Sequence, residues 1–344
     1  LVRSSERGVR HMGVGEYYNS TQAKGTEYEV WTTEGWQKAK PVRVPMTKTY
    51  KITLSNGVEV KFGKDHLQPV RGLGTLHADQ LKEGMWLPFN KEEVETNEVG
   101  SKELGFAVGA FIGDGSYDDK SLVYSLNKSS KKEVLESLEK FWNSLGFETT
   151  VSSKKDEKLA ILRVKGDPRS IISKYVDGET ALTKSLKRMV FNSSVSFREG
   201  VIEGFRVTDG AVEKKRLYTS SPQLREDIQE LFSSLGRKAM INYVDIRDGR
   251  YGKNPNFRID YPGRKKYGQL YDEDENFIYH SITKIEEINP IGDYLYCVEL
   301  DTEDKLFMLS NGLMTHNCRL RLDLRELRNN SGGGYFGSGD STGS

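Results

Sequence analysis

Hydrophobic and polar residues alternate along the early part of the chain, which is the pattern of half-buried β-strands. The alternation covers residues 25–42 and continues through residues 50–62, where Asn56-Gly57 is a turn signal between two strands of a hairpin. Residues 78–89 then predict a short helical turn followed by another strand. This part of the chain is therefore expected to form β structure.

The same pattern returns near the end of the chain. Residues 293–300 predict one strand, and residues 305–310 predict a second strand after an acidic turn. Asn311-Gly312 follows as a hairpin signal. This second β segment delivers the tripeptide His316-Asn317-Cys318 at its end.

Between the two β segments, a helical pattern occurs twice. Residues 104–117 and residues 198–212 each predict a helix that reaches an aspartate and a glycine, with Asp114 in the first and Asp209 in the second. A strand and an amphipathic helix follow in both cases, and both amphipathic helices close on Ser-Leu-Gly. The middle of the chain is therefore predicted to be an internal duplication.

Small residues along both predicted helices would let the two backbones approach closely. They are Ala107, Gly109, Ala110 and Gly113 in the first helix, and Gly204 and Thr208 in the second. Side-by-side packing would bring Asp114 and Asp209 together at the helix ends. Two adjacent carboxylates repel each other unless a divalent cation lies between them, so the pair predicts a Mg²⁺ site.

A basic stretch lies in the second half of the duplication. The predicted strands of the region are residues 123–127, 159–164, 216–219 and 240–247. Residues 250–268 then hold six basic residues and one acidic residue, interleaved with aromatic residues. The basic residues are Arg250, Lys253, Arg258, Arg264, Lys265 and Lys266. Such a run is often only a solvated face, but its place beside predicted strands favours contact with DNA phosphates.

The tripeptide at the end of the second β segment suggests peptide-bond chemistry. An asparagine side-chain amide can attack its own main-chain carbonyl, which forms a cyclic imide and breaks the following bond. His316 could polarise that bond beside Asn317, and Cys318 could supply a thiolate nucleophile. A His-Asn-Cys tripeptide also occurs by chance, so this interpretation depends on the strands and turns predicted around it.

Composition narrows the class of protein without selecting a function. The 344 residues predict two domains, and 51 basic residues nearly balance 50 acidic ones. Hydrophobic residues make up 36% of the chain, and no apolar run approaches the roughly 20 residues of a membrane span. We expect no signal peptide. The two cysteines, Cys297 and Cys318, cannot form a disulfide framework, which favours a reducing cytosol.

The run from Tyr294 to Cys318 resembles the C-terminal splicing blocks of inteins, in which a strand pair carries the terminal His-Asn before the downstream flank. Residues 21–97 resemble the N-terminal part of the same all-β, Hint-type splicing domain, and residues 282–317 would complete it. The resemblance implies that His316 and Asn317 act at the downstream bond and that His66 polarises the upstream bond. The other interpretation of His66 is a surface histidine in a turn.

Two departures from the intein pattern concern the upstream bond. Gly63 stands where the family usually has threonine, and no cysteine precedes Gly25-Thr26 at the usual distance. The candidate nucleophiles there are Ser20 and Thr21. Either Ser20 is the first nucleophile, or the natural nucleophile was replaced, or splicing follows a different route.

One variant intein route uses a cysteine in the penultimate strand region, where Cys297 lies. Inteins of that kind usually have tryptophan two residues after the upstream histidine, whereas this chain has Gln68. Cys297 as a buried strand cysteine is therefore the preferred interpretation.

The two duplicated helices resemble the signature helices of single-chain LAGLIDADG homing endonucleases. The matching runs are VGAFIGDG and EGFRVTDG. The resemblance implies an α+β domain over residues 98–281, built from two αββαββα repeats at about 98–190 and 191–281. It also implies that Asp114 and Asp209 are catalytic ligands of Mg²⁺ and that double-stranded DNA is the partner.

The two ends of the chain read as flanks. Residues 1–20 are interpreted as host-protein residues or a tag remnant, and residues 318–344 resemble a segment of anaerobic-type ribonucleotide reductases. The expected protein is a monomeric, multidomain intein that remains covalently attached to host exteins until it splices. The alternatives are a splicing-impaired intein, a degenerate LAGLIDADG domain that binds DNA or RNA without cutting, and a reductase fragment.

Overall fold

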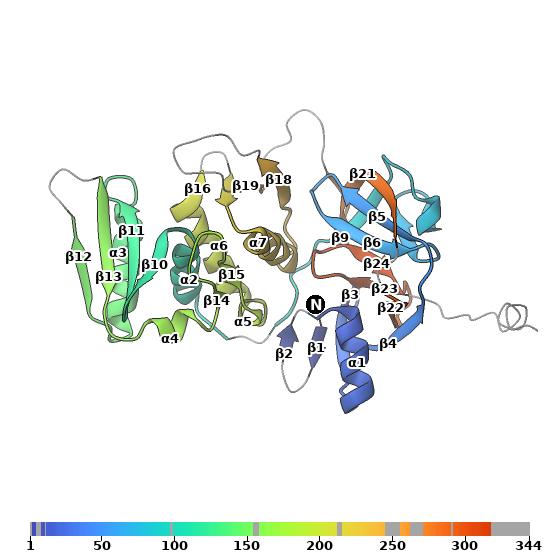
Figure 1. Ribbon diagram of the computed structural model, residues 1–344, viewed down its shortest axis with the longest axis horizontal. Helices are drawn as coiled ribbons and strands as arrows, with labels where there is room; N and C mark the ends of the chain where they lie inside the picture. The colour runs from blue at the N-terminus through green and yellow to red at the C-terminus, as the bar shows by residue number, and fades with distance from the viewer. Residues whose placement is uncertain are drawn as a thin grey trace, which may run out of the picture.

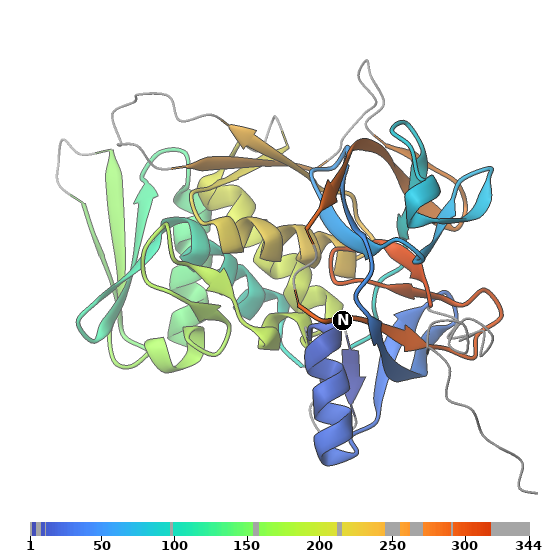
Figure 2. The same ribbon diagram turned by 45° about the vertical axis from the view of Figure 1, so that its right-hand side comes forward.

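Figure 1 shows the computed structural model, in which helices and antiparallel sheets form a mixed α/β architecture. The structure describes residues 2–4, 8–10, 12–96, 99–153, 158–211, 215–244, 255–261, 271–289 and 292–317. A β-rich part contains both ends of the described chain, and the middle of the chain lies beside it in both views (Figures 1 and 2). No described helix is long and apolar enough to cross a membrane.

The β-rich part contains a five-stranded sheet with the order β2-β1-β3-β4-β22. Its strands are β1 (Val2–Ser4), β2 (Gly8–Arg10), β3 (Tyr28–Thr32), β4 (Gly35–Pro45) and β22 (Tyr294–Glu299). Cys297 of β22 lies opposite Val42 of β4. Strands from the two ends of the chain therefore complete one sheet.

A second sheet has the order β20-β21-β5-β6, and β9 also pairs with β21. Its strands are β5 (Thr49–Leu54), β6 (Glu59–Gly63), β9 (Trp86–Asn90), β20 (Asp272–Glu273) and β21 (Phe277–Ile288). The predicted hairpin between β5 and β6 is present, and Gly57 has the positive φ of 81° that this turn requires.

Two hairpins complete the β-rich part. The first pairs β7 (Leu67–Val70) with β8 (Gly74–His77), followed by the 3-10 helix η1 (Ala78–Gln80). The second pairs β23 (Leu306–Met308) with β24 (Met314–His316). The predicted Asn311-Gly312 turn joins β23 to β24, so it presents His316 at the end of a paired strand.

Two predicted domain boundaries fall inside secondary structure. The predicted flank at residues 1–20 contributes β1, which pairs with β3, and it ends inside helix α1 (Val14–Lys24). The predicted boundary between residues 281 and 282 falls inside β21, because that strand begins at Phe277 and pairs there with Asn90 of β9. Strand pairing in both places joins segments that are far apart in the sequence, which a local pattern does not indicate.

The middle of the chain contains two halves with the same order of elements, which confirms the predicted duplication. The first half contains α2 (Lys102–Asp114), β10 (Gly115–Asp118), β11 (Ser121–Asn127), α3 (Lys132–Ser144), β12 (Thr149–Ser152) and β13 (Leu159–Val164). The second contains α6 (Val195–Asp209), β16 (Gly210–Ala211), β17 (Arg216–Thr219), α7 (Pro222–Ser234), β18 (Met240–Val244) and β19 (Asn256–Asp260). Their sheet orders, β10-β11-β13-β12 and β16-β17-β19-β18, correspond strand for strand.

Four short elements connect the two halves. They are α4 (Arg169–Ile172), β14 (Val176–Asp177), β15 (Ser185–Leu186) and α5 (Arg188–Phe191). The strand β14 pairs with β15, and this pair holds Lys184 immediately before β15.

Helices α2 and α6 pack directly against each other through glycines. A Cβ atom at Gly109 would lie 2.1 Å from the main-chain oxygen of Val201, and one at Gly204 would lie 2.1 Å from that of Phe106. Neither position has room for a side chain, so the predicted close approach of the two backbones is confirmed. Gly105, which the sequence analysis did not single out, is equally crowded.

A buried arginine joins the middle of the chain to the segment that follows β9. Arg198 of α6 is 0% exposed and donates to the main-chain oxygens of Ser234 and Val94, at 2.7 Å each. Burial lowers the pKa of its guanidinium to about 10. Because a buried charge is costly without partners, these contacts fix α6 and the end of α7 against residue 94.

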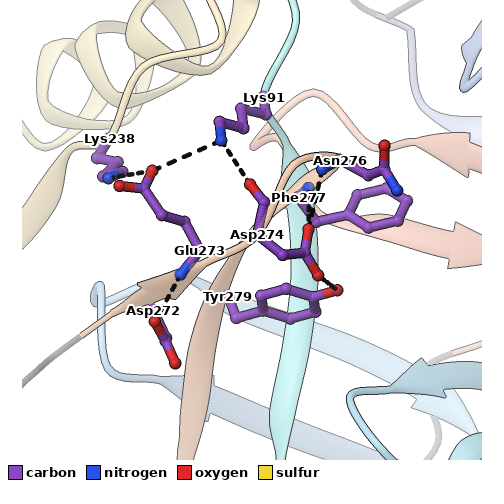
Figure 3. Close-up of polar contacts among 8 residues, drawn as sticks. All are labelled: Lys91, Lys238, Asp272, Glu273, Asp274, Asn276, Phe277 and Tyr279. Atoms are coloured by element: carbon purple, nitrogen blue, oxygen red, sulfur yellow. Dashed lines mark hydrogen bonds and ion pairs between the residues drawn. The ribbon is translucent and has the colours of Figure 1, made fainter.

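A second, polar junction lies at the β20–β21 hairpin (Figure 3). Lys238 pairs with Glu273 at 2.6 Å, and Lys91 donates to the main-chain oxygen of Asp274. Asp274 in turn accepts a 2.7 Å hydrogen bond from the Tyr279 hydroxyl. These contacts tie residues of both parts to one hairpin.

Candidate functional site

An asparagine follows directly after β24, and a histidine contacts its main-chain carbonyl. His316 Nδ1 lies 2.7 Å from the main-chain oxygen of Asn317. Because a carbonyl oxygen only accepts hydrogen bonds, Nδ1 must carry the proton that it donates. That oxygen belongs to the bond between residues 317 and 318, so His316 is placed to polarise the bond that asparagine cyclisation would break.

Asn317 is buried, with 4% exposure, and is held by two further hydrogen bonds. Its main-chain N–H donates to the oxygen of Lys305 at 2.8 Å, and its side-chain Nδ2 donates to the oxygen of Leu300 at 3.2 Å. Its Oδ1 atom is buried and has no hydrogen-bond partner within the described chain. The side chain is therefore oriented through Nδ2, the atom that would attack the carbonyl carbon.

His66 contacts the same strand one residue earlier. Its Nε2 atom lies 2.6 Å from the Thr315 hydroxyl, and its ring stacks on Phe62 with centroids 4.2 Å apart. Thr315 is 1% exposed and donates to Gln68 Oε1 at 2.8 Å. The structure thus brings the predicted upstream histidine to the strand that carries the downstream residues, through Thr315, which the sequence did not indicate.

The predicted nucleophiles lie in other surroundings. Ser20 lies within α1, and its hydroxyl is 3.0 Å from that of Tyr28. No described contact joins Ser20 to His66. Cys297 is 5% exposed and packs in the core of the five-stranded sheet, in agreement with the preferred interpretation as a strand cysteine. Cys318 lies outside the described residues.

The ends of α2 and α6 bring Asp114 and Asp209 into electrostatic contact, as predicted. The dense protein around Asp209 desolvates its carboxyl and raises its pKa to about 6, and the negative charge of Asp114 adds to this shift. Solvent nevertheless reaches part of the Asp209 side chain. The pKa of the Asp209 carboxyl therefore responds to the charge of Asp114, and the Asp209 side chain remains accessible to solvent.

Two lysines accompany these carboxylates, and the sequence pattern did not indicate either. Lys131 donates to Asp114 Oδ2 at 2.5 Å and also to the main-chain oxygen of Thr208. Lys184 is 4% exposed, and burial lowers its pKa to about 8 against the opposing influence of Asp209 and Asp114. Lys184 donates to the main-chain oxygens of Phe111, Ile112 and Gly115, at the end of α2.

The carboxylate pair suits a divalent cation. Mg²⁺ is commonly bound by one or two carboxylates, while waters and substrate phosphate complete its shell. Asp114 and Asp209 supply such a pair, and their mutual repulsion would be relieved by a bound cation. Within the described ranges, no group of three or more His, Cys, Asp or Glu side chains could hold a metal. Two carboxylates, with water and phosphate as further ligands, form a donor set that fits a divalent cation such as Mg²⁺.

Only one of the predicted DNA-binding residues can be placed. Arg258 lies on β19 with its Nε 3.0 Å from Asp260, and Arg216 of β17 contacts the same carboxylate at 3.0 Å. Asp260 therefore neutralises part of the positive charge on this sheet. The other predicted residues, Arg250, Lys253, Arg264, Lys265 and Lys266, lie outside the described residues.

Solved structures similar to this chain include LAGLIDADG proteins. One is the homing endonuclease I-DmoI in complex with DNA and Mn, with a TM-score of 0.35, 14% identity, and coverage of 47% of this chain and 89% of that chain. Another is the N-terminal LAGLIDADG domain of DUF199/WhiA, with a TM-score of 0.31, 12% identity, and coverage of 47% and 76%.

Two curated proteins are similar in sequence. Transcription initiation factor IIB of Methanocaldococcus jannaschii is 25% identical over 331 residues, which cover 92% of this chain and 46% of that protein. A DNA polymerase of Acanthamoeba polyphaga mimivirus is 25% identical over 320 residues, which cover 84% of this chain and 17% of the polymerase. The chain thus spans less than half the length of either relative. No protein-family model matches the chain.

Proposed function

We propose that this chain is an intein that excises itself from a host protein and carries a LAGLIDADG homing endonuclease within its sequence. The observation that carries the splicing half is the 2.7 Å contact between His316 Nδ1 and the main-chain oxygen of Asn317. The observation that supports the endonuclease half is the pair Asp114 and Asp209 at the ends of two glycine-packed helices.

The proposed downstream reaction uses His316, Asn317 and Cys318. Donation from His316 draws electrons from the Asn317 carbonyl and makes its carbon more electrophilic. Asn317 Nδ2 attacks that carbon, loses one proton and closes a succinimide ring. The carbon–nitrogen bond breaks, and the main-chain nitrogen of Cys318 takes up one proton and leaves as an amine. Before this step, the Cys318 thiolate would have accepted the upstream acyl group, so cyclisation releases the joined exteins.

The upstream reaction rests on the sequence resemblance. His66 is assigned to polarise the upstream bond, and Ser20 and Cys297 are the alternative nucleophiles. Ser20 would need to leave its contact with Tyr28, and Cys297 would need to reach a substrate from the core of a sheet. The position of Cys297 therefore favours the ordinary route over the variant one.

The two sequence relatives also fit the proposal. Their names describe different functions, yet each aligns with most of this chain over a minor share of its own length. A segment that inserts into unrelated host proteins would give this pattern. A shared host activity would instead align the regions that the two host proteins have in common.

The proposed endonuclease would hydrolyse phosphodiester bonds in both DNA strands. Asp114 and Asp209 would hold Mg²⁺, which supplies positive charge to the phosphate and lowers the pKa of a bound water. Lys131 lies beside Asp114 and would remain near the phosphate, where its charge opposes developing negative charge. Lys184 holds the end of α2 in place through three main-chain oxygens.

The second candidate is a LAGLIDADG domain that binds DNA or RNA without cutting. The 2.5 Å ion pair between Lys131 and Asp114 favours it, because this lysine occupies a carboxylate that the cation would need. A cleavage assay on the intein-less host sequence, with Mg²⁺ and with a chelator, separates the two. Cutting that requires Mg²⁺ supports the endonuclease, and binding without cutting supports the alternative.

Mass spectrometry of the full chain tests the splicing proposal. The expected result is loss of the downstream flank by cleavage between residues 317 and 318, with a succinimide or its hydrolysis product at the new terminus. Asn317→Ala should keep that bond intact, whereas Asn276→Ala, which alters an exposed asparagine, should not protect it. Cleavage at the same bond in Asn317→Ala would refute the mechanism.

A further inference from the structure

We propose that Gln68 and Thr315 act as positioning residues that fix the proton of the His66 ring on Nε2. His66 Nδ1 is then the nitrogen that exchanges a proton at the upstream bond. The inference about the ring proton follows from the hydrogen-bond network alone. Its consequence for the upstream bond rests on the proposed splicing function.

The first step of the argument concerns the Gln68 amide. Gln68 is 0% exposed, and one end of its amide lies 2.9 Å from the main-chain oxygen of Met314. A main-chain oxygen can only accept a hydrogen bond, so the amide nitrogen must occupy this end. Oε1 therefore occupies the other end, which faces Thr315. The orientation of the Gln68 amide is therefore fixed by the Met314 oxygen, which can only accept a hydrogen bond.

The second step concerns the Thr315 hydroxyl, which has one hydrogen. Gln68 Oε1 can only accept, and it lies 2.8 Å from Thr315 Oγ1, so the hydroxyl hydrogen points to Gln68. At 1% exposure, Thr315 has no alternative solvent partner for that hydrogen. Its lone pairs remain for His66 Nε2, 2.6 Å away. Two acceptors cannot share this contact, so Nε2 must carry a proton.

The third step follows from the tautomers of imidazole. With a proton fixed on Nε2, the neutral His66 ring has its lone pair on Nδ1, and protonation adds a proton there. Nε2 therefore remains a donor to Thr315 in both charge states. Stacking on Phe62 and the hydrogen bond from the His66 main-chain N–H to the Gly63 oxygen, at 3.0 Å, hold the ring and its backbone in place.

In the proposed upstream reaction, the lone pair on His66 Nδ1 would carry the proton. As a hydroxyl or thiol attacks the upstream carbonyl carbon, its proton moves to Nδ1. As the carbon–nitrogen bond breaks, the same proton passes to the main-chain nitrogen, which becomes an amine. The ring returns to its starting state, and no other reactant is needed. A His66 ring with the opposite tautomer would have a donor on Nδ1 and could not accept the first proton.

Nitrogen NMR of the full chain labelled with ¹⁵N-histidine tests the assignment. Above the pH at which His66 becomes neutral, its Nε2 should show the signature of a protonated nitrogen and Nδ1 that of a bare one. A neutral ring that is protonated on Nδ1 in the wild-type protein would overturn the proposal. This readout needs no cleavage, so it remains valid even if the chain does not splice.

Substitutions at Thr315 separate positioning from packing. Thr315→Val keeps the shape of the side chain but removes the hydroxyl, so the neutral ring should populate both tautomers and upstream cleavage induced by a thiol should fall about 10-fold or more. Thr315→Ser should restore the Nε2–H tautomer and the cleavage rate. Thr49→Val, which removes a buried hydroxyl bonded to the main chain of its own segment, is the matched control.

The outcomes distinguish this inference from the proposed function. Unchanged tautomer populations in Thr315→Val would refute the positioning role of the hydroxyl. If the wild-type chain shows the predicted tautomer but no upstream cleavage, the positioning role of Gln68 and Thr315 is supported and the splicing proposal is not. If Thr315→Val does not fold, the wild-type tautomer and the Thr315→Ser spectrum still decide whether Nε2 carries the proton.

Discussion

The Thr315 hydroxyl lies 2.6 Å from His66 Nε2, one residue before the histidine that contacts the downstream carbonyl. His66 therefore contacts β24, and His316, which contacts the carbonyl of Asn317, is the last residue of the same strand. They also use different nitrogens, because His66 presents Nε2 to a hydroxyl and His316 presents Nδ1 to a carbonyl. The two splice junctions are thus expected to have separate chemistry but a shared strand.

The downstream junction should depend on His316 more than on His66. In His316→Ala, cleavage between residues 317 and 318 should slow about 10²–10⁴-fold, because the carbonyl loses its polarising donor. His66→Ala should slow thiol-induced upstream cleavage more than asparagine cyclisation. Rates of product formation, followed by gel electrophoresis and mass spectrometry, measure both effects.

His77→Ala provides a matched control for loss of an imidazole, because His77 is exposed at the end of β8. It should leave both rates near wild type. Equal slowing of both bonds by His316→Ala and His66→Ala would show that the assignment of one histidine to each junction is wrong.

The helical core could be predicted from the sequence because its signals are local. Glycine recurs at the spacing of one helix face in α2 and α6, and glycine is the residue that lets a backbone approach to the distance found at Gly109. The hairpins at Gly57 and Gly312 were also predictable, since Asn-Gly sets the turn within a few residues.

Other features could not be predicted because they depend on contacts between distant segments. Lys184 approaches the end of α2 only after β14 and β15 pair, and no sequence period marks it. Thr315 becomes a site residue only because Gln68 lies opposite it in the folded chain. Strand β1 pairs with β3, which places the predicted N-terminal flank in a sheet. A local sequence pattern does not predict this pairing either.

The turn between β23 and β24 should depend on α7. Gln229 and Ser233 both donate to the main-chain oxygen of Asn311, at 3.0 and 2.9 Å. The double variant Gln229→Ala/Ser233→Ala removes both donors from a turn five residues before His316. If loss of these hydrogen bonds raises the activation free energy of downstream cleavage by about 1 kcal/mol, the cleavage rate should fall about 5-fold.

Gln223→Ala, an exposed change on the same helix, is the control for a general effect on α7. DNA cleavage should be near wild type in both proteins, since none of these residues contacts the carboxylate pair. A wild-type downstream rate in the double variant, with its fold intact, would show that the turn holds its shape without the helix.

The pKa of Asp209 predicts how stability depends on pH in the absence of metal. Because the folded-state pKa is raised to about 6, the folded protein binds more protons than the unfolded chain between about pH 4 and pH 6. The free energy of unfolding should therefore fall as pH rises through this window and stay lower above it. Solvent screening reduces the effect, so we expect about 1 kcal/mol.

Asp209→Asn should remove this dependence. With a chelator present, the variant should be more stable than wild type at pH 8 and similar to it at pH 4, as measured by urea denaturation. Asp167→Asn, which neutralises an exposed aspartate between β13 and α4, should follow the wild-type pH profile. A variant that loses stability at pH 8 would mean that Asp209 is stabilised, not strained, by its surroundings.

Mg²⁺ should reverse the order of stability, and the same two carboxylates should then control DNA cleavage. A ligand that binds only the folded state stabilises it, so Mg²⁺ should raise the stability of wild type but not that of Asp114→Asn or Asp209→Asn.

Asp114→Asn and Asp209→Asn should also each abolish double-strand cleavage of DNA, while some nicking of one strand remains. Each amide removes a negative charge that would hold the cation and activate water. DNA affinity should stay near wild type or increase, because phosphate contacts come from basic side chains and each variant removes a repelling charge. Splicing should be unaffected, since neither aspartate touches β24. Both strands cut at the wild-type rate by either variant would place the nuclease site elsewhere.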